Sequence, residues 1–137
     1  FEVETVDPNT PPANEIWYTS IDGKIVEPYS DANHQASSSF DASIVSNVYK
    51  DGKGIITFDK DVTTIGRYAF FARHNLESIV LPNGIISIGD YAFQSCYYSL
   101  AKVVIPESVT SIGTSAFSSC AALVDITIPN CLQLINS

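Results

Sequence analysis

The three cysteines of this chain are its most chemically versatile side chains, able to form a disulfide or to bind a metal. Cys96 and Cys120 each follow an Ala-Phe pair at the same distance, so they stand at equivalent positions of a repeat, where their Cα atoms would lie within disulfide range. The favoured interpretation is a pair of reduced, buried thiols, because a free cysteine behaves as a small hydrophobe. Cys131 leaves an odd count, which argues against a disulfide framework. The three positions also lack the paired spacing of a zinc site.

Histidines and carboxylates are the other candidate metal ligands. His34 lies in a polar stretch and His74 in a turn before Leu76, and neither has a second histidine or a cysteine at ligand spacing. Four aspartates offer the oxygen ligands that calcium prefers: Asp22, Asp51, Asp59 and Asp61. The first two belong to Asp-Gly turns, and no Asp-x-Asp-x-Asp-Gly loop occurs. Solvated turn carboxylates are therefore the favoured interpretation, and no metal site is predicted.

The chain lacks the short motifs of common catalytic sites. It has no Gly-x-Ser-x-Gly, no phosphate-binding glycine loop and no His-Glu-x-x-His, so we predict no enzymatic activity and no cofactor. A net charge of −8 with only seven lysines and arginines argues against nucleic acid as a partner, because phosphate binding needs clustered cations. No apolar run approaches the roughly 18–20 residues of a membrane span, which argues against membrane insertion.

The phrase Ile-Gly-x-x-Ala-Phe occurs three times, beginning at Ile65, Ile88 and Ile112. The steps are 23 and 24 residues, and each phrase is followed by a leucine and then by an apolar residue before a proline. These residues are Leu76 with Leu81-Pro82, Leu100 with Ile105-Pro106, and Leu123 with Ile128-Pro129. A fixed period of this length identifies a repeat protein whose units stack.

One repeat unit predicts a short coil of chain. Between Leu100 and Ile105 inward apolar residues alternate with outward ones, as in a half-buried strand, and Pro106 ends the strand because it has no N–H. The glycine of each phrase opens a turn, and the x-x-Ala-Phe segment is long enough for about one helical turn. A lone unit buries too little surface to fold. Successive units must therefore stack, with a core column of Phe70, Phe93 and Phe117.

The first 53 residues differ from the repeats. Residues 1–14 carry three prolines and predict an extended tether, residues 15–53 predict a cap, and residues 54–137 hold the repeats, fused to the cap as one domain. The segments 16–21 and 24–29 flank Asp22-Gly23 and predict a β-hairpin that covers the open end of the stack. Segments 44–49 and 55–58 predict a second hairpin. Its last strand should occupy a repeat-strand position, because Ile56 precedes Ile79 by one period.

These phrases resemble the BspA-type leucine-rich repeats, a bacterial subclass with the unit x-Ile-Gly-x-x-Ala-Phe-x-x-Cys-x-x-Leu-x-x-Ile-x-Ile-Pro. The match covers residues 54–135, and the second unit has one extra residue between Cys96 and Leu100. The resemblance implies an α+β, mostly β, leucine-rich repeat solenoid of about three and a half coils of 23–24 residues with an N-terminal β-hairpin cap. It also implies that Cys96 and Cys120 point inward. A fourth phrase begins at Ile135 without a C-terminal cap, so we expect further sequence to follow.

The resemblance further implies a bacterial cell-surface or secreted protein, since relatives are described as adhesins that bind host matrix proteins or other microbes. We therefore predict a non-enzymatic protein-recognition or adhesion module whose partners are host extracellular matrix proteins or other surface proteins. The chain begins at Phe1 without a positively charged, apolar leader, so we expect that a leader has been removed. A structural spacer at the end of a longer repeat array is the first alternative, and a glycan-binding module is the second.

Surface residues of the repeats are the candidate binding site. On the repeat strands the outward positions form two rows across three coils, namely Ser78 and Val80, Lys102 and Val104, and Asp125 and Thr127. Such small, mixed residues equally suit parallel strand pairing without a ligand. Tyr97 and Tyr98, in the turn with the extra residue, are better candidates, because tyrosine gives a large amphipathic contact area at low entropic cost. The alternative is that they pack against Phe71 and Arg73 of the neighbouring coil.

Overall fold

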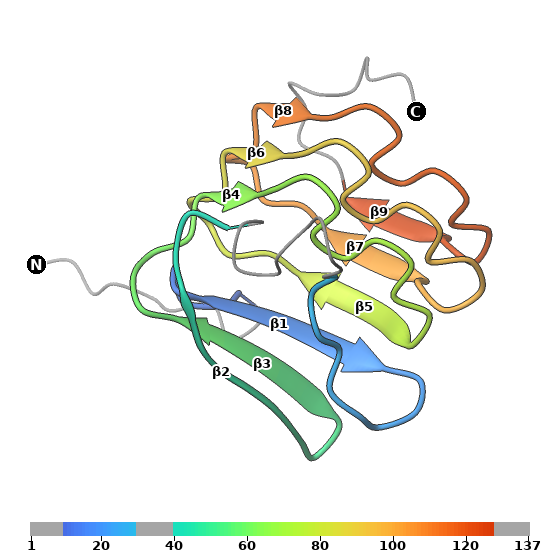
Figure 1. The fold of residues 1–137 in the computed structure, drawn as a ribbon, viewed down its shortest axis with the longest axis horizontal. Helices are drawn as coiled ribbons and strands as arrows, with labels where there is room; N and C mark the ends of the chain where they lie inside the picture. Colours follow the sequence, from blue (N-terminus) through green and yellow to red (C-terminus); the bar gives the residue numbers. More distant parts are fainter. Residues whose placement is uncertain (1–9, 30–39, 128–137) are drawn as a thin grey trace, which may run out of the picture.

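The computed structural model describes residues 10–29 and 40–127 of the 137-residue chain. These residues form nine β-strands and no helix (Figure 1). In chain order the strands are β1 (Glu15–Ser20), β2 (Ile44–Lys50), β3 (Lys53–Phe58), β4 (Thr64–Ile65), β5 (Leu76–Val80), β6 (Ser87–Ile88), β7 (Lys102–Val104), β8 (Ser111–Ile112) and β9 (Asp125–Thr127). The predicted predominance of strands is confirmed, and the helical part of the predicted α+β class is wrong for the described residues.

Each repeat contributes one strand to each of two sheets (Figure 1). The smaller sheet has the order β4-β6-β8, and the larger has the order β2-β3-β1-β5-β7-β9. Strands of successive repeats are parallel, as predicted, with Ile79 opposite Val103 and Val103 opposite Ile126. These steps are 24 and 23 residues, so the extra residue of the second repeat is absorbed in the turn before β7 and the strands stay in register.

The predicted phenylalanine column runs through the core of the stack. The rings of Phe70 and Phe93 stack with centroids 5.3 Å apart and planes at 9°, and those of Phe93 and Phe117 with centroids 5.1 Å apart and planes at 4°. Phe70 and Phe93 have no exposed surface, and Phe117 is half-buried. Because each ring contacts the ring of the next repeat, the burial of one repeat depends on the presence of its neighbours.

The segment after each Ile-Gly pair is a run of tight turns, so the predicted helical turn is wrong. In the first repeat Phe71 N–H bonds within the turn to the carbonyl of Tyr68 at 3.2 Å, whereas Phe70 N–H bonds to the carbonyl of Ala92 in the next repeat at 2.7 Å. The run is not helical, because two positions in each repeat have left-handed φ angles. The first are Tyr68 (62°), Tyr91 (60°) and Ser115 (55°), and the second are Ala72 (55°), Ser95 (65°) and Ser119 (59°). Hydrogen bonds between repeats thus take the place of helical ones.

β1 does not form the predicted hairpin with residues 24–29, which contain no strand. It lies instead between β3 and β5 and pairs antiparallel with both, so that Trp17 is opposite Ile55 on one side and Val80 on the other (Figure 1). Both edges of β1 are therefore occupied, and none is left for residues 24–29. The predicted turn does form, with Gly23 at a φ of 72° and the Asp22 carboxylate accepting a hydrogen bond from Lys24 N–H.

The second predicted hairpin is confirmed. β2 and β3 pair antiparallel around Asp51 and Gly52, whose φ angles of 54° and 78° suit a two-residue turn. β3 also runs parallel to β5 in the same sheet, as expected of a repeat strand, but β1 occupies the place between them. One period of sequence therefore corresponds to two strand positions at this end of the sheet. The fourth phrase, from Ile135, lies outside the described residues.

Tyr18 joins β1 to the chain segments around it. Its hydroxyl donates a hydrogen bond to Asn47 Oδ1 at 2.6 Å and accepts one from Val26 N–H at 3.1 Å, while Asn47 Nδ2 donates to the Val26 carbonyl at 3.0 Å. The ring lies against Gly54, where a Cβ atom would collide with it. Burial raises the pKa of the Tyr18 hydroxyl above its usual value.

Candidate functional site

The candidate surface residues of the repeats form the two predicted rows across β5, β7 and β9. The first row holds Ser78, Lys102 and Asp125, and the second holds Val80, Val104 and Thr127, each residue opposite the next. Between the rows, Ile79 and Val103 are fully buried. Because side chains alternate across a strand, both rows face away from the core.

Charge on this face is concentrated in the first row. The Lys102 ammonium lies 4.0 Å from the Asp125 carboxylate, and these side chains are 55% and 60% exposed. An exposed pair of this kind contributes at most about 1 kcal/mol. Both groups can therefore exchange their mutual contact for one with a partner at little cost.

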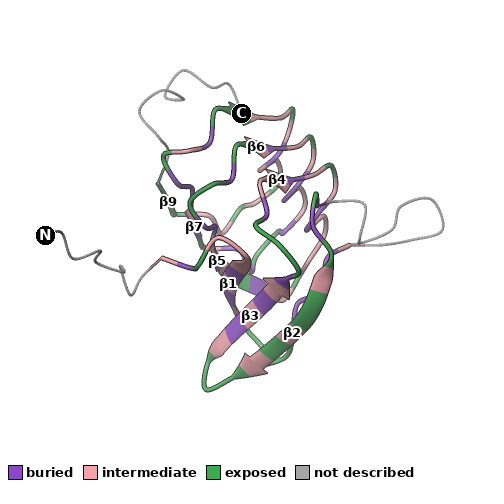
Figure 2. Cartoon of the chain, turned by 90° about the vertical axis from the view of Figure 1, so that its left-hand side faces the viewer, coloured by how far each residue is buried: buried purple, intermediate pink, exposed green. Residues whose placement is uncertain are grey.

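The outward face continues onto β1, which the sequence pattern had placed in a covering hairpin. Along β1 and β3, buried residues alternate with half-buried ones that form this face (Figure 2). Trp17 lies opposite Val80, and Thr19 lies opposite Ser78 with their hydroxyl oxygens 2.6 Å apart. Trp17 is thus a surface residue that sequence reasoning missed. The alternation of Glu15, Trp17 and Thr19 indicates one shared face but not which strands flank it.

Trp17 is held by a charged residue on either side. Its indole N–H donates a hydrogen bond to the Glu15 carboxylate at 2.9 Å. The Lys53 ammonium lies 3.2 Å from the centroid of the ring. A cation–π contact at an exposed site contributes about 0.5–1 kcal/mol. The two contacts together fix the orientation of the ring on the outward face.

Tyr97 and Tyr98 lie in the turn that leads into β7. Their exposed fractions are 46% and 86%. The Tyr97 ring centroid lies 6.3 Å from that of Tyr98 and 5.3 Å from that of His74 in the neighbouring repeat. The Tyr97 ring therefore packs against His74, whereas the sequence offered packing against Phe71 and Arg73 as the alternative to a binding role. Most of the Tyr98 ring faces solvent.

Cys96 and Cys120 are free thiols that bond one repeat to the preceding one. The Cys96 thiol donates to the carbonyl of Phe70 at 3.4 Å, and the Cys120 thiol donates to the carbonyl of Phe93 at 3.1 Å. The neighbouring Cys120 thiol and burial both raise the pKa of the Cys96 thiol above its usual value. Both side chains point inward, as the resemblance implied. Cys131 lies outside the described residues.

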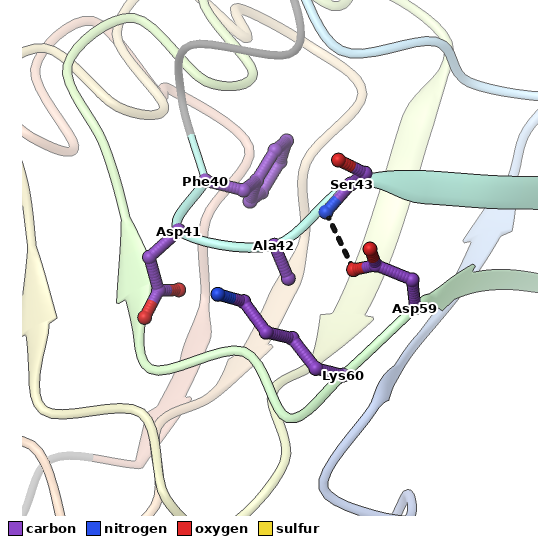
Figure 3. Close-up of a pocket in the computed structure, with 6 residues that line it drawn as sticks. All are labelled: Phe40, Asp41, Ala42, Ser43, Asp59 and Lys60. Atoms are coloured by element: carbon purple, nitrogen blue, oxygen red, sulfur yellow. Dashed lines mark hydrogen bonds between the residues drawn. The ribbon is translucent and has the colours of Figure 1, made fainter.

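A shallow cavity of about 300 Å³ lies where the chain enters β2 (Figure 3). It is lined by Phe40, Asp41, Ala42, Ser43, Asp59 and Lys60. Asp41 accepts hydrogen bonds from the N–H groups of Thr63 and Thr64 at 2.9 and 3.2 Å, and Asp59 accepts one from Ser43 N–H at 2.9 Å. Burial acts to raise the pKa of Asp41, but the hydrogen bonds from the threonines lower it below its usual value. These carboxylates stabilise local turns.

Residues 10–29 and 40–127 contain no group of three or more His, Cys, Asp or Glu side chains that could hold a metal ion. Among the aspartates considered for calcium, Asp22 accepts hydrogen bonds from Lys24 N–H and from the Asn75 side chain, as a turn carboxylate does. His34 is outside the described ranges. Within those same ranges no helix has the length and apolar character that crossing a membrane requires.

A family model described as the BspA type leucine-rich repeat region (6 copies) matches residues 43–137, which is more than half of the chain. The chain belongs to the BspA-type leucine-rich repeat family. The predicted resemblance is therefore confirmed, and the match begins next to β2, so it includes the β2–β3 hairpin as well as the repeats. No curated protein and no solved structure matches the chain. Repeat families of this kind are generally non-enzymatic binding scaffolds.

Proposed function

We propose that this chain is a non-enzymatic protein-recognition or adhesion module, secreted or displayed on a bacterial cell surface, that binds host extracellular matrix proteins or other surface proteins. Membership of the BspA-type family supports protein recognition, because stacked repeats present an extended surface and bring no chemistry of their own. In this proposal the repeats of residues 54–137 form one solenoid with the cap of residues 15–53, and residues 1–14 are a tether.

The exposure of Tyr97 and Tyr98 is the observation that carries the proposal. Two adjacent phenol rings, 46% and 86% exposed, give amphipathic surface that is open to a partner. They lie a few residues before Lys102, the first residue of β7 and a member of the row with Ser78 and Asp125. Tyrosine is enriched among the residues that contribute most to binding in protein interfaces, so this turn and the adjoining rows are the proposed footprint.

Replacing Tyr97 and Tyr98 together by alanine is expected to weaken binding to a matrix partner at least tenfold, because truncating aromatic contact residues costs about 2 kcal/mol or more. Surface plasmon resonance of the immobilised chain against a panel of host matrix glycoproteins measures this change. Ile86→Ala is the matched control, since that side chain is 51% exposed but adjoins the smaller sheet. If a triple variant with Tyr97→Ala, Tyr98→Ala and Lys102→Ala bound the matrix partner as tightly as the native chain, this footprint would be ruled out.

A structural spacer is the second candidate function. It is favoured by the contact between Lys102 and Asp125, because outward residues that pair with one another need no ligand. In that role the repeats would hold another domain away from the cell envelope. A flat response across the matrix panel, together with many more repeats in the full-length gene, would favour the spacer over the recognition module.

A further inference from the structure

One apolar row crosses all six strands of the larger sheet on its outward face. Its members lie opposite one another in the order Val48, Ile55, Trp17, Val80, Val104 and Thr127, and only the last is polar. Val48 is 54% exposed, and the four residues that follow it are half-buried. The solvent-facing side of a sheet usually carries polar residues, so an apolar row there indicates a contact surface.

A row that holds three lysines runs along one side of this apolar row. Besides Thr19, Ser78 and Asp125, it holds the lysines Lys50 and Lys53, opposite each other on β2 and β3, and Lys102 on β7. These are three of only seven lysines and arginines in a chain with a net charge of −8. Lys102 is balanced by Asp125 at 4.0 Å, whereas Lys50 and Lys53 are like charges on directly opposed residues, which disfavours the pairing of their strands. An anion between the two ammonium groups would relieve that repulsion.

The two rows match the size and chemistry of one amphipathic segment. Six strands spaced by about 4.8 Å give an apolar row about 24 Å long. A helix of about 16 residues has the same length, at about 1.5 Å per residue. If carboxylates border its apolar stripe on one side, they reach Lys50 and Lys53 when the stripe covers the row. The Lys53 ammonium now lies 3.2 Å from the Trp17 ring centroid, and a carboxylate that binds it would uncover the ring for apolar contact.

We infer that the outward face of the six-stranded sheet binds an acidic amphipathic helix of another protein. Trp17 is the central apolar contact, and Lys50 and Lys53 are the charge contacts. The inference rests on the proposed function in protein recognition and adds the chemistry of the partner. It places the main contact on the cap strands, which the sequence assigned only to covering the repeats, and leaves the Tyr97–Tyr98 turn as a separate contact.

Two synthetic helical peptides test this inference by fluorescence anisotropy. Both carry the same leucine stripe, bordered by glutamates in one peptide and by lysines in the other. The whole chain is expected to bind the glutamate peptide saturably and at least tenfold more tightly than the lysine peptide. The double variant Lys50→Glu, Lys53→Glu should reverse this preference, and Trp17→Ser should weaken binding of the glutamate peptide about tenfold. Lys24→Glu is the matched control, because it changes an exposed charge in the turn after β1.

Equal binding of the two peptides, or a preference that survives the reversal of Lys50 and Lys53, would overturn the inference. Urea midpoints equal to that of the native chain show that the variants are folded. A dimer in sedimentation equilibrium that Trp17→Ser abolishes would make a second copy the occupant and would also overturn it. If the tyrosine variant loses matrix binding and neither peptide binds, the inference fails while the proposed function stands. Binding of the glutamate peptide together with a flat response across the matrix panel would support the inference and contradict matrix proteins as partners.

Discussion

Phe93→Ala is expected to lower the free energy of unfolding by about 3–5 kcal/mol, the cost of removing a large aromatic side chain from a packed core. Phe93 has no exposed surface and stacks on Phe70 and Phe117 at centroid distances of 5.3 and 5.1 Å. It is the middle ring of the column, so its removal leaves a cavity between two repeats and breaks both stacked contacts. Urea unfolding followed by circular dichroism measures the change.

Tyr98→Ala is the matched control for the phenylalanine column. Its ring is 86% exposed, so truncation should change the free energy of unfolding by no more than about 0.5 kcal/mol. A loss at Phe93 as small as the loss at Tyr98 would show that the column does not hold the repeats together. A clear difference supports the stacked core on which the spacing of the outward rows depends.

Gly89→Ala is expected to destabilise the chain by about 3 kcal/mol, the upper part of the range for overpacking. A Cβ atom at this position would lie 2.7 Å from the amide nitrogen of Arg67 and 2.8 Å from the carbonyl carbon of Gly66. Both are backbone atoms of the preceding repeat and cannot move aside unless the stack opens. The Gly89 N–H also bonds to the carbonyl of Ile65 at 2.7 Å, which holds the two backbones together.

Gly23→Ala separates this collision from ordinary backbone strain. Gly23 has a φ of 72°, but a Cβ atom there meets nothing within 4 Å. Its replacement should therefore cost only the left-handed penalty, about 1–2 kcal/mol. If both glycine variants lowered the urea midpoint equally, close approach of the repeats would not be the reason for glycine at position 89.

The strands of the repeats could be predicted from sequence because their determinants are local. Alternating apolar residues end at a proline in each unit, and the period of 23–24 residues places Ser78, Lys102 and Asp125 in one row. The repeat glycine was expected for a different reason from the one the structure gives. The sequence favoured a flexible turn, whereas Gly89 is needed where two backbones meet, and that contact depends on stacking rather than on local conformation.

The position of β1 could not be predicted, because its partners are distant in sequence. The segments on either side of Asp22-Gly23 have the local pattern of a hairpin. Trp17 pairs instead with Ile55 and Val80, and the resulting contacts with β3 and β5 use both edges of the strand. The candidate site was therefore predicted only on the repeats, and the part contributed by Trp17 was missed.

The apolar row across all six strands of the larger sheet depends on β1 lying between β3 and β5. A strand with neighbours on both sides has successive N–H groups bonded to alternate neighbours, whereas an edge strand leaves every second N–H open to water. Residue-resolved amide hydrogen exchange at Trp17 and Tyr18 is the most direct test, because these adjacent residues pair on both edges. We predict that both amides exchange as slowly as those of β5. Slow exchange at only one of the two would contradict this arrangement and return β1 to the edge of the sheet.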